Sequence, residues 1–387
     1  MDTKNFKTKT VFKMRDNGDS GSKWCVALDV GYSAVKVFSP NIYAEFASYA
    51  KKEPANFIGK IGGNVILYQD LETGETWTVG ETAQDRIDIS DANETEAGLY
   101  NRQRYNSPMF LVLCRTGIGI SCLNLASNAP NGRELFVQTG LPPRYLKSDQ
   151  EMMKNVIRGR HHFSLQLGSG EKMEFDLYIK PENIDVISQP RGTLYSVAVG
   201  NDHQLTENAE SLLNSSVVVF DAGFGTLDIF PLMANHVEES QTFDNLGMKR
   251  VFQETVAEIN RRYDQDLTVP VFQKYLTTGA FRYQKRDPEG RMITKDIPFD
   301  DILKEKNYQV CMEAVDKLEQ VVPMAGYNYL IITGGTSAAW NQIIRDRFKT
   351  SSTLTIIAGN RNDSISMAFA NVRGYFMYRC NIIENGE

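Results

Sequence analysis

The sequence contains no apolar run long enough to span a membrane, and it has few of the residues that usually hold metals. Its 387 residues include only five cysteines and four histidines, which are scattered without the spacing of a metal site. No apolar segment approaches the roughly 20 residues of a membrane helix, and the N-terminus lacks a signal-peptide core. We therefore expect a cytoplasmic protein with reduced cysteines, no zinc site and no membrane association.

The chain also lacks an excess of positive charge. Lys and Arg number 42 against 48 Asp and Glu, which gives a net charge of −6. This balance argues against direct, non-specific binding to DNA, so any role with DNA requires an adaptor. A hydrophobic content of 42% is typical of a globular protein, and the length suffices for two or more domains, each with its own core.

The strongest functional signal is the stretch VVVFDAGFGTLD at residues 217–228. Its apolar start predicts a buried strand that leads Asp221, Gly223, Gly225 and Thr226 into a tight turn before a second strand. The glycines allow backbone N–H groups to approach phosphate oxygens, and the Thr adds a hydroxyl. The Asp can face phosphate only with a cation, which implies Mg²⁺ held through water. An ordinary β-turn uses the same residue types.

The same pattern occurs a second time near the N-terminus. Residues 28–38 (LDVGYSAVKVF) align without a gap with residues 220–230 (FDAGFGTLDIF), and the Asp, the first Gly and the final Phe coincide. Two distant copies of one hairpin indicate two similar domains whose turns face a shared ligand. Lys36 in the first copy takes the place of Asp228, so one half supplies a cation for phosphate.

Two further motifs each predict a strand whose end could contact a ligand. Gln189 ends a predicted strand, and a helix of small and apolar residues begins beyond Pro190 and Gly192, which predicts an interdomain crossing. Residues 329–337 (YLIITGGTS) predict a buried strand that ends in adjacent glycines, where a flat ligand can lie against the backbone. A last helix is predicted from about residue 363 onward.

In their order and spacing, these motifs resemble the five-part signature of the actin, seventy-kilodalton chaperone and sugar kinase superfamily. Its parts, phosphate 1, connect 1, phosphate 2, adenosine and connect 2, are matched by residues 29–36, 189–192, 221–226, 332–335 and 364–374. The resemblance extends from about Trp24 to the C-terminus. Within the superfamily the chain looks most like the ParM-like bacterial actins of plasmid segregation, on the stretches TGLP (139–142), QPxG (189–192) and ANxxG (370–374).

The resemblance implies an α/β protein with the actin-like fold. Two related domains would each contain a mixed sheet flanked by helices, with the nucleotide in the cleft between them. We expect a flexible extension (1–23), domain I (24–188) with a small inserted subdomain (about 40–106) and completed by 364–387, and domain II (189–363). The extension has no counterpart in the family that we can match.

The resemblance also assigns a role to each matched residue. Asp29 and Asp221 would hold Mg²⁺ through water. Gln189 would orient the attacking water, because it stands where better-known ParM proteins have Glu and an amide cannot act as a carboxylate base. Phosphate contacts would come from Lys36 and from backbone N–H groups of Gly31, Tyr32, Ser33, Gly223, Phe224, Gly225 and Thr226. Adenosine contacts would come from Asn245, Gly247, Gln273, Lys274, Gly334, Gly335 and Thr336.

The function implied by this resemblance is that of a filament-forming ATPase, and the choice between ATP and GTP stays open. Subunits would stack head to tail with Mg-ATP and separate after hydrolysis, and a ParR-type DNA-binding adaptor on a centromere-like site would link the filament to a plasmid. Two alternatives stay open: a metabolic kinase of the same superfamily, and a scaffold or cell-shape bacterial actin. A kinase needs a carboxylate base and a substrate pocket that the sequence does not mark.

Overall fold

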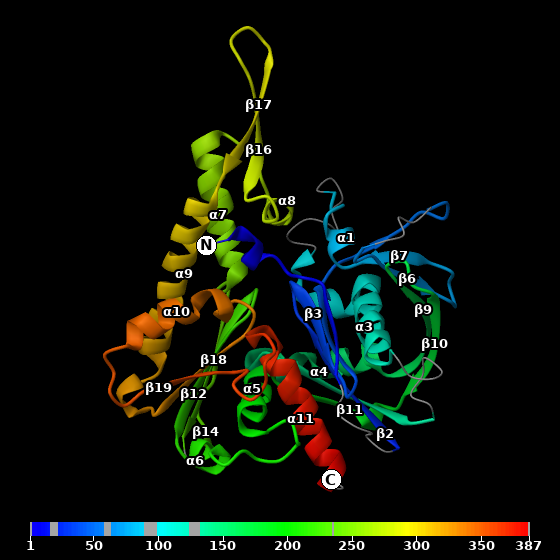
Figure 1. The fold of residues 1–387 in the computed structure, drawn as a ribbon, viewed down its shortest axis with the longest axis vertical. Coiled ribbons are helices and arrows are strands. Elements are labelled where there is room, and N and C mark those ends of the chain that lie inside the picture. The colour runs from blue at the N-terminus through cyan, green and yellow to red at the C-terminus, as the bar shows by residue number, and fades with distance from the viewer. Residues whose placement is uncertain are drawn as a thin grey trace.

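The computed structural model describes residues 2–15, 22–57, 63–88, 99–123, 132–233 and 236–385. Two lobes stand side by side, each built around its own mixed sheet, with α5 (Gln189–Ala198) and α11 (Ala370–Asn385) between them (Figure 1). The predicted α/β class and two-lobed architecture are therefore confirmed. In the described part of the chain no helix combines the length and the apolar character that a membrane span requires. All five cysteines are buried and free of disulfides.

The main sheet of the first lobe has six strands. Their spatial order is β1 (Val11–Met14), β4 (Ile42–Ala47), β3 (Ala34–Phe38), β2 (Lys23–Val30), β8 (Glu134–Leu141) and β11 (Ile184–Ser188). The central strand β2 pairs antiparallel with β3 and parallel with β8. Because successive side chains of a strand point to opposite faces, Val26 and Leu28 pack with α3 (Pro108–Ser121) while Cys25 and Ala27 pack with α11.

A second, smaller sheet in the first lobe differs from the predicted insertion at about 40–106. Its order is β10 (Lys172–Ile179), β9 (Gly159–Leu167), β6 (Ile66–Asp70), β7 (Thr76–Val79) and β5 (Ala50–Lys52). Strand β4 belongs to the main sheet, and β9 and β10 come from far outside the predicted range. The antiparallel pairing of β6 with β9 joins segments about a hundred residues apart, which local sequence patterns do not reveal. Residues 58–62 and 89–98 of that range lie outside the described residues.

The sheet of the second lobe repeats the plan of the first. Its strands are β14 (His236–Val237), β13 (Thr226–Met233), β12 (Ser216–Ala222), β18 (Tyr329–Thr333) and β19 (Thr355–Ala358), with β15 (Gln241–Asp244) also on β13. Strand β12 pairs antiparallel with β13 and parallel with β18, as β2 does with β3 and β8. Asp221 lies opposite Asp228 in this hairpin, and Asp29 lies opposite Lys36 in the other. The gapless alignment of the two hairpins is thus confirmed in register.

Helices cover both lobes. The second lobe carries α7 (Met248–Tyr263), α8 (Val269–Tyr275), α9 (Asp300–Val321) and α10 (Ser337–Phe348), which share one apolar core with β12 and β18. Shorter helices are α1 (Glu81–Gln84) and α6 (Ala209–Leu213), and α4 (Pro143–Ile157) packs on the first lobe. Strands β16 (Ala280–Arg286) and β17 (Met292–Pro298) form a separate hairpin that projects from the body at the end opposite α6 (Figure 1).

Helices α5 and α11 cross in close contact between the two lobes. A Cβ atom at Gly374 of α11 would overlap the carbonyl group of Gly192 in α5. The fully buried Arg373 guanidinium fixes this crossing by donating to Ser196 O and to Asn201 Oδ1, each at 2.7 Å. Helix α11 begins at Ala370, later than predicted, because a 3-10 turn capped by the Ser366 hydroxyl precedes it.

The described part of the N-terminal extension is anchored to both lobes, so the prediction of a flexible tail is wrong there. The 3-10 turn η1 (Thr3–Phe6) buries Phe6 in the core of the second lobe, and Thr3 Oγ1 donates to Leu276 O at 2.8 Å. Strand β1 then pairs antiparallel with β4. Both partners are distant in sequence, which explains why the weak apolar pattern alone gave no sign of them. Residues 16–21 lie outside the described residues.

Candidate functional site

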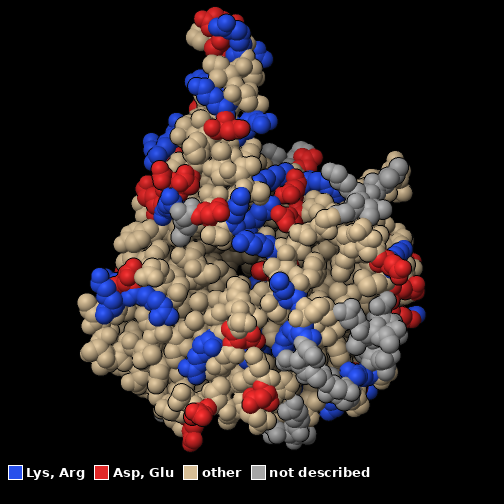
Figure 2. Space-filling view, viewed as in Figure 1, with Lys and Arg blue, Asp and Glu red and all other residues tan. Residues whose placement is uncertain are grey.

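A cavity of about 600 Å³ lies where the two hairpins meet between the lobes. Figure 2 shows the corresponding hollow, with Lys and Arg side chains on its rim. Its volume is that of a small-molecule site. Most predicted site residues line it: Asp29, Gly31, Tyr32, Ser33, Lys36, Gln189, Asp221, Gly223, Phe224, Gly225, Thr226, Gln273, Gly334, Gly335 and Thr336.

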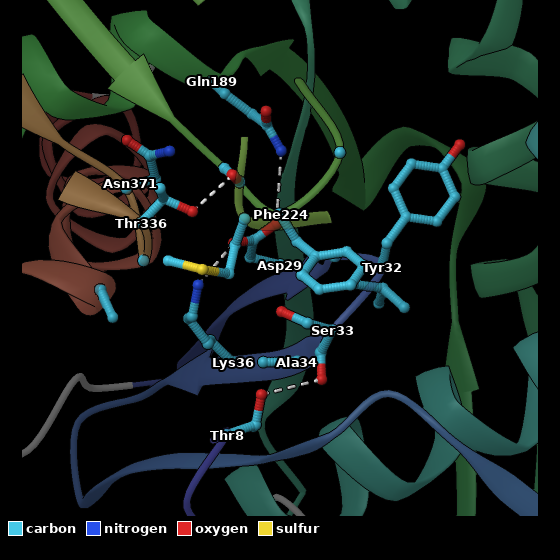
Figure 3. Close-up of a pocket in the computed structure, with 18 of the residues that line it drawn as sticks. Thr8, Asp29, Tyr32, Ser33, Ala34, Lys36, Gln189, Phe224, Thr336 and Asn371 are labelled. Carbon is cyan, nitrogen blue, oxygen red and sulfur yellow. Dashed lines mark hydrogen bonds and ion pairs between the residues drawn. The ribbon is translucent and has the colours of Figure 1, made fainter. Parts of the chain in front are cut away.

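Two almost fully buried carboxylates face this cavity, one from each lobe. Asp29 at the end of β2 has Lys36 Nζ 3.8 Å from its Oδ2 atom, and Gln189 Nε2 donates to its Oδ1 at 3.5 Å (Figure 3). Asp221 at the end of β12 accepts a 2.6 Å hydrogen bond from Asn371 Nδ2. Gln189 is the first residue of α5 and Asn371 the second of α11, so the two crossing helices each begin at a carboxylate.

Burial disfavours the charged forms of both carboxyl groups of the second hairpin, Asp221 and Asp228. The pKa of Asp221 is raised to about 6, chiefly because the carboxyl is buried; the hydrogen bond from Asn371 lowers this pKa, and the charge of Asp29 contributes to the rise. Burial also raises the pKa of Asp228 well above its usual value, although this carboxyl accepts a 2.5 Å hydrogen bond from Thr242 Oγ1. A bound cation would relieve this unfavourable burial of charge.

The oxygen donors present fit Mg²⁺ held mostly through water. Asp29 and Asp221 supply carboxylate oxygens, the ligand type that Mg²⁺ prefers. Among the described residues no group of three or more His, Cys, Asp or Glu side chains could enclose a metal ion. Water and phosphate oxygens would therefore complete the coordination, as is usual for Mg²⁺ bound with a nucleotide.

The turn geometry corrects the predicted set of phosphate donors. The N–H groups of Gly31 and Gly223 each close their own turn, by donating at 2.9 Å to Ala34 O and Thr226 O. These two amides are committed within the hairpins, which leaves the amides at 32, 33, 224, 225 and 226 as the candidates for phosphate. A Cβ atom at Gly225 would lie 3.1 Å from the Tyr32 ring, so the turns of the two hairpins touch.

The two glycines after β18 serve different purposes. Gly334 has φ +90°, and a Cβ atom there would overlap the carbonyl oxygen of Ala222, so this position excludes a side chain. A Cβ at Gly335 would meet nothing within 4 Å, which leaves an open backbone surface at the cavity. Thr336 Oγ1 donates to Gly223 O at 2.6 Å and ties this loop to the second hairpin (Figure 3).

Three predicted adenosine contacts lie elsewhere in the described structure, and none of them lines the cavity. The Asn245 N–H donates to Gly225 O at 3.0 Å, and a Cβ at Gly247 would overlap the carbonyl of Gly223. Both residues therefore contact the backbone of the second hairpin outside the cavity. Lys274 Nζ donates to Ile87 O at 2.9 Å, which joins the second lobe to the first. The sequence placed these residues near the motif without showing which way they face.

Arg104 and Asn371 are among the residues that line the cavity but were absent from the predicted set. Arg104 Nη1 donates to Gly31 O at 2.8 Å, and its guanidinium lies 4.3 Å from the centroid of the Tyr32 ring. No motif in its polar neighbourhood marks this residue. Asn371, by contrast, belongs to the ANxxG stretch that was noted in the sequence, so its asparagine was a usable signal.

Comparison with known proteins identifies the architecture. Residues 27–192 match the family of actin-like protein N-terminal domains. A 15-stranded ParM filament structure from Clostridium botulinum superposes with a TM-score of 0.71 and 18% identity, covering 92% of this chain and 99% of that one. The chain has the actin-like fold.

Two further structures are similar to this actin-like chain. The pCBH ParM non-polymerisable quadruple mutant has a TM-score of 0.68 at 18% identity, covering 92% of this chain and 98% of that one. An archaeal actin homologue has a TM-score of 0.62 at 16% identity, covering 94% and 99%. No curated protein matches the sequence. The resemblance to ParM-like actins is thus confirmed as a resemblance of fold.

Proposed function

We propose that the protein is an actin-like nucleoside triphosphatase that binds Mg-ATP or Mg-GTP between its lobes, assembles into filaments and separates after hydrolysis. The observation that carries this proposal is the meeting of two matched phosphate-type hairpins at one cavity, each with a buried carboxylate, Asp29 and Asp221. The similarity to a ParM filament structure supports self-assembly. As in the family the chain resembles, the cargo would be plasmid DNA, held by a ParR-type adaptor.

The proposed chemistry is transfer of a phosphoryl group to water. Lys36 and the turn amides would hold the phosphates, and Asp29 and Asp221 would hold the metal ion through water. When bound, Mg²⁺ neutralises charge on the phosphates. Gln189 donates through Nε2 to Asp29, so its Oε1 atom would be the one to accept a hydrogen bond from the attacking water. Catalysis then depends on positioning and electrostatics.

Light scattering and phosphate release, followed in one sample of the purified protein, test this function. We expect scattering to rise above a critical concentration with Mg-ATP or Mg-GTP, and to decay as phosphate accumulates. Scattering should not rise in samples without nucleotide or in samples with EDTA. Absence of scattering at every concentration, with hydrolysis only after a small molecule is added, would contradict the filament and favour a kinase of the same fold.

The projecting hairpin supports a head-to-tail contact between copies of the chain. Met292 and Ile293 are 56% and 39% exposed at its tip. The hairpin has an excess of basic residues, because Arg282 and Arg291 form ion pairs with its three acidic residues, Asp287, Glu289 and Asp296, and it also carries Lys285, Arg286 and Lys295. Near α6, at the opposite end of the molecule, Leu205 is 65% exposed beside acidic residues: Asp202, Glu207 and Glu210 (Figure 1). Apolar contacts and opposite charges can thus meet when subunits stack end to end.

Substitution of Met292 by Glu is expected to raise the critical concentration for assembly about tenfold, because it replaces an apolar contact by a buried charge at the subunit interface. Sedimentation of filaments against protein concentration measures the effect. Tyr178→Glu, at an exposed apolar position on β10 of the first lobe, is the control and should change the critical concentration little. Equal behaviour of the two variants would show that the hairpin tip lies outside the subunit contact.

A further inference from the structure

The N-terminal segment, residues 2–14, lies across the mouth of the cavity. Figure 1 shows it running from beside the helices of the second lobe to the sheet of the first. Phe6 and Thr3 anchor its start in the second lobe, and β1 anchors its end on β4 of the first lobe. Six residues of this segment line the cavity: Asn5, Phe6, Lys7, Thr8, Lys9 and Val11.

Lys7 joins the two lobes through one ammonium group. Its Nζ atom lies 2.8 Å from Glu81 Oε1 and 3.4 Å from Asp85 Oδ1, both at α1 of the first lobe. The same atom donates to Thr277 Oγ1, just beyond α8 of the second lobe, at 3.0 Å. The Lys7 side chain is 11% exposed, whereas those of Glu81 and Asp85 are 29% and 50% exposed, so these charge-assisted contacts lie at the rim of the cavity, within reach of solvent.

The same two helices also meet directly. Gln84 Nε2 of α1 donates to Gln273 Oε1 of α8 at 3.5 Å, and Lys274 Nζ donates to Ile87 O. Tyr100 adds a hydrogen bond from its hydroxyl to Gln273 Oε1 at 3.1 Å. The Lys7 contacts therefore lie at a rim of the cavity where the two lobes also contact each other directly. Opening the cavity at this rim requires both the Lys7 contacts and these direct hydrogen bonds to break.

The segment also reaches the first hairpin. Thr8 Oγ1 donates to Ser33 O at 3.3 Å, at the turn whose amides are candidates for phosphate (Figure 3). Movement of the segment away from the cavity thus breaks a contact to the phosphate turn as well as the contacts of Lys7. Of its attachments, the polar ones at Lys7 and Thr8 are the most easily exchanged for water, because Phe6 is in the core and β1 is in the sheet.

We propose that residues 2–14 form a strap that closes the cavity in cis and slows nucleotide exchange. Lys7 is its clasp: release of Lys7 from Glu81, Asp85 and Thr277 removes one of the links between α1 and α8 and makes their separation easier, while Phe6 and β1 keep the strap attached to both lobes. This role rests on the proposed function, because the strap encloses whatever occupies the cavity. It gives the chain a control over exchange that is built into its own N-terminus.

Dissociation of a fluorescent ADP analogue, chased with excess unlabelled ADP in a stopped-flow instrument, tests the clasp. Lys7→Met keeps the length of the side chain and removes its charge, and we expect dissociation to become about tenfold faster, the scale of one charge-assisted hydrogen bond. Lys4→Met, an exposed lysine of the same turn, is the matched control and should stay within about twofold of the unmodified protein. Equal rates for both variants would overturn the proposal.

A second measurement separates the strap from the proposed function. If the unmodified protein binds no fluorescent ADP, the nucleotide site fails, and amide hydrogen exchange without nucleotide then decides the strap alone. We expect faster exchange in α1 and α8 for Lys7→Met than for Lys4→Met. Unchanged exchange in both helices would overturn the clasp. Thr277→Val, which removes the contact from the opposite lobe, should accelerate exchange in the same places, so a folding defect at residue 7 cannot imitate the result.

Discussion

Phosphate release is expected to slow about 100-fold when Gln189 is replaced by Ala, the scale on which removal of one positioned polar group acts. Gln189 lines the cavity and donates to Asp29, so its loss removes the group that orients water without removing either carboxylate. Nucleotide affinity and assembly should change little, since the hairpin turns and Lys36 are untouched. Filaments should therefore form normally and persist longer.

The measurement for this variant is single-turnover phosphate release, alongside equilibrium nucleotide binding. Gln309→Ala, at an exposed position on α9, is the control and should hydrolyse at the unmodified rate. A Gln189→Ala protein with unchanged hydrolysis would exclude Gln189 from the catalytic arrangement. A variant that loses binding and hydrolysis together would instead make Gln189 a support for Asp29.

Alanine at Gly374 is expected to reduce the free energy of unfolding by about 3 kcal/mol, because a Cβ atom there would overlap the backbone of Gly192. The loss would occur although Ala is intrinsically favoured over Gly in a helix by about 1 kcal/mol. Backbone atoms cannot rotate out of the way as a flexible side chain can, so α5 and α11 must separate. That separation would also displace Gln189 and Asn371 at the starts of the two helices.

Urea unfolding measures the change in stability, with Gly326→Ala as the control. A Cβ at Gly326 would meet nothing within 4 Å, so that substitution should alter the free energy of unfolding by less than about 0.5 kcal/mol. A Gly374→Ala protein as stable as the control would mean that the helix crossing relaxes without cost.

The sequence predicted the parts of the fold that are encoded locally. Each hairpin carries its own turn residues, and the register of Asp29 with Lys36 and of Asp221 with Asp228 follows from gapless alignment. The strand before Gly334 could also be predicted from the sequence, because an apolar run that stops at two glycines is recognised without knowledge of its distant partners. These local signals also carried the resemblance to actin-like proteins.

Contacts between distant segments were not predictable in the same way. Pairing of β1 with β4 depends on the exposed edge of a sheet, and the weak apolar pattern at Phe6 gives no sign of the core that receives it. Arg104 reaches the first hairpin from a polar region that carries no motif. Lys274 was placed near the base from sequence position, whereas its side chain turns to Ile87. Side-chain direction at a domain boundary depends on the opposite domain.

The crossing of α5 and α11 makes the pair a lever. Gln189 and Asn371 each precede the contact glycines, Gly192 and Gly374, by three residues, a short arm of about 4.5 Å at 1.5 Å per residue. Helix α11 continues 11 residues beyond the crossing, a long arm of about 16 Å. A rotation about the crossing would therefore displace the far end of α11 more than three times as far as the residues at the cavity.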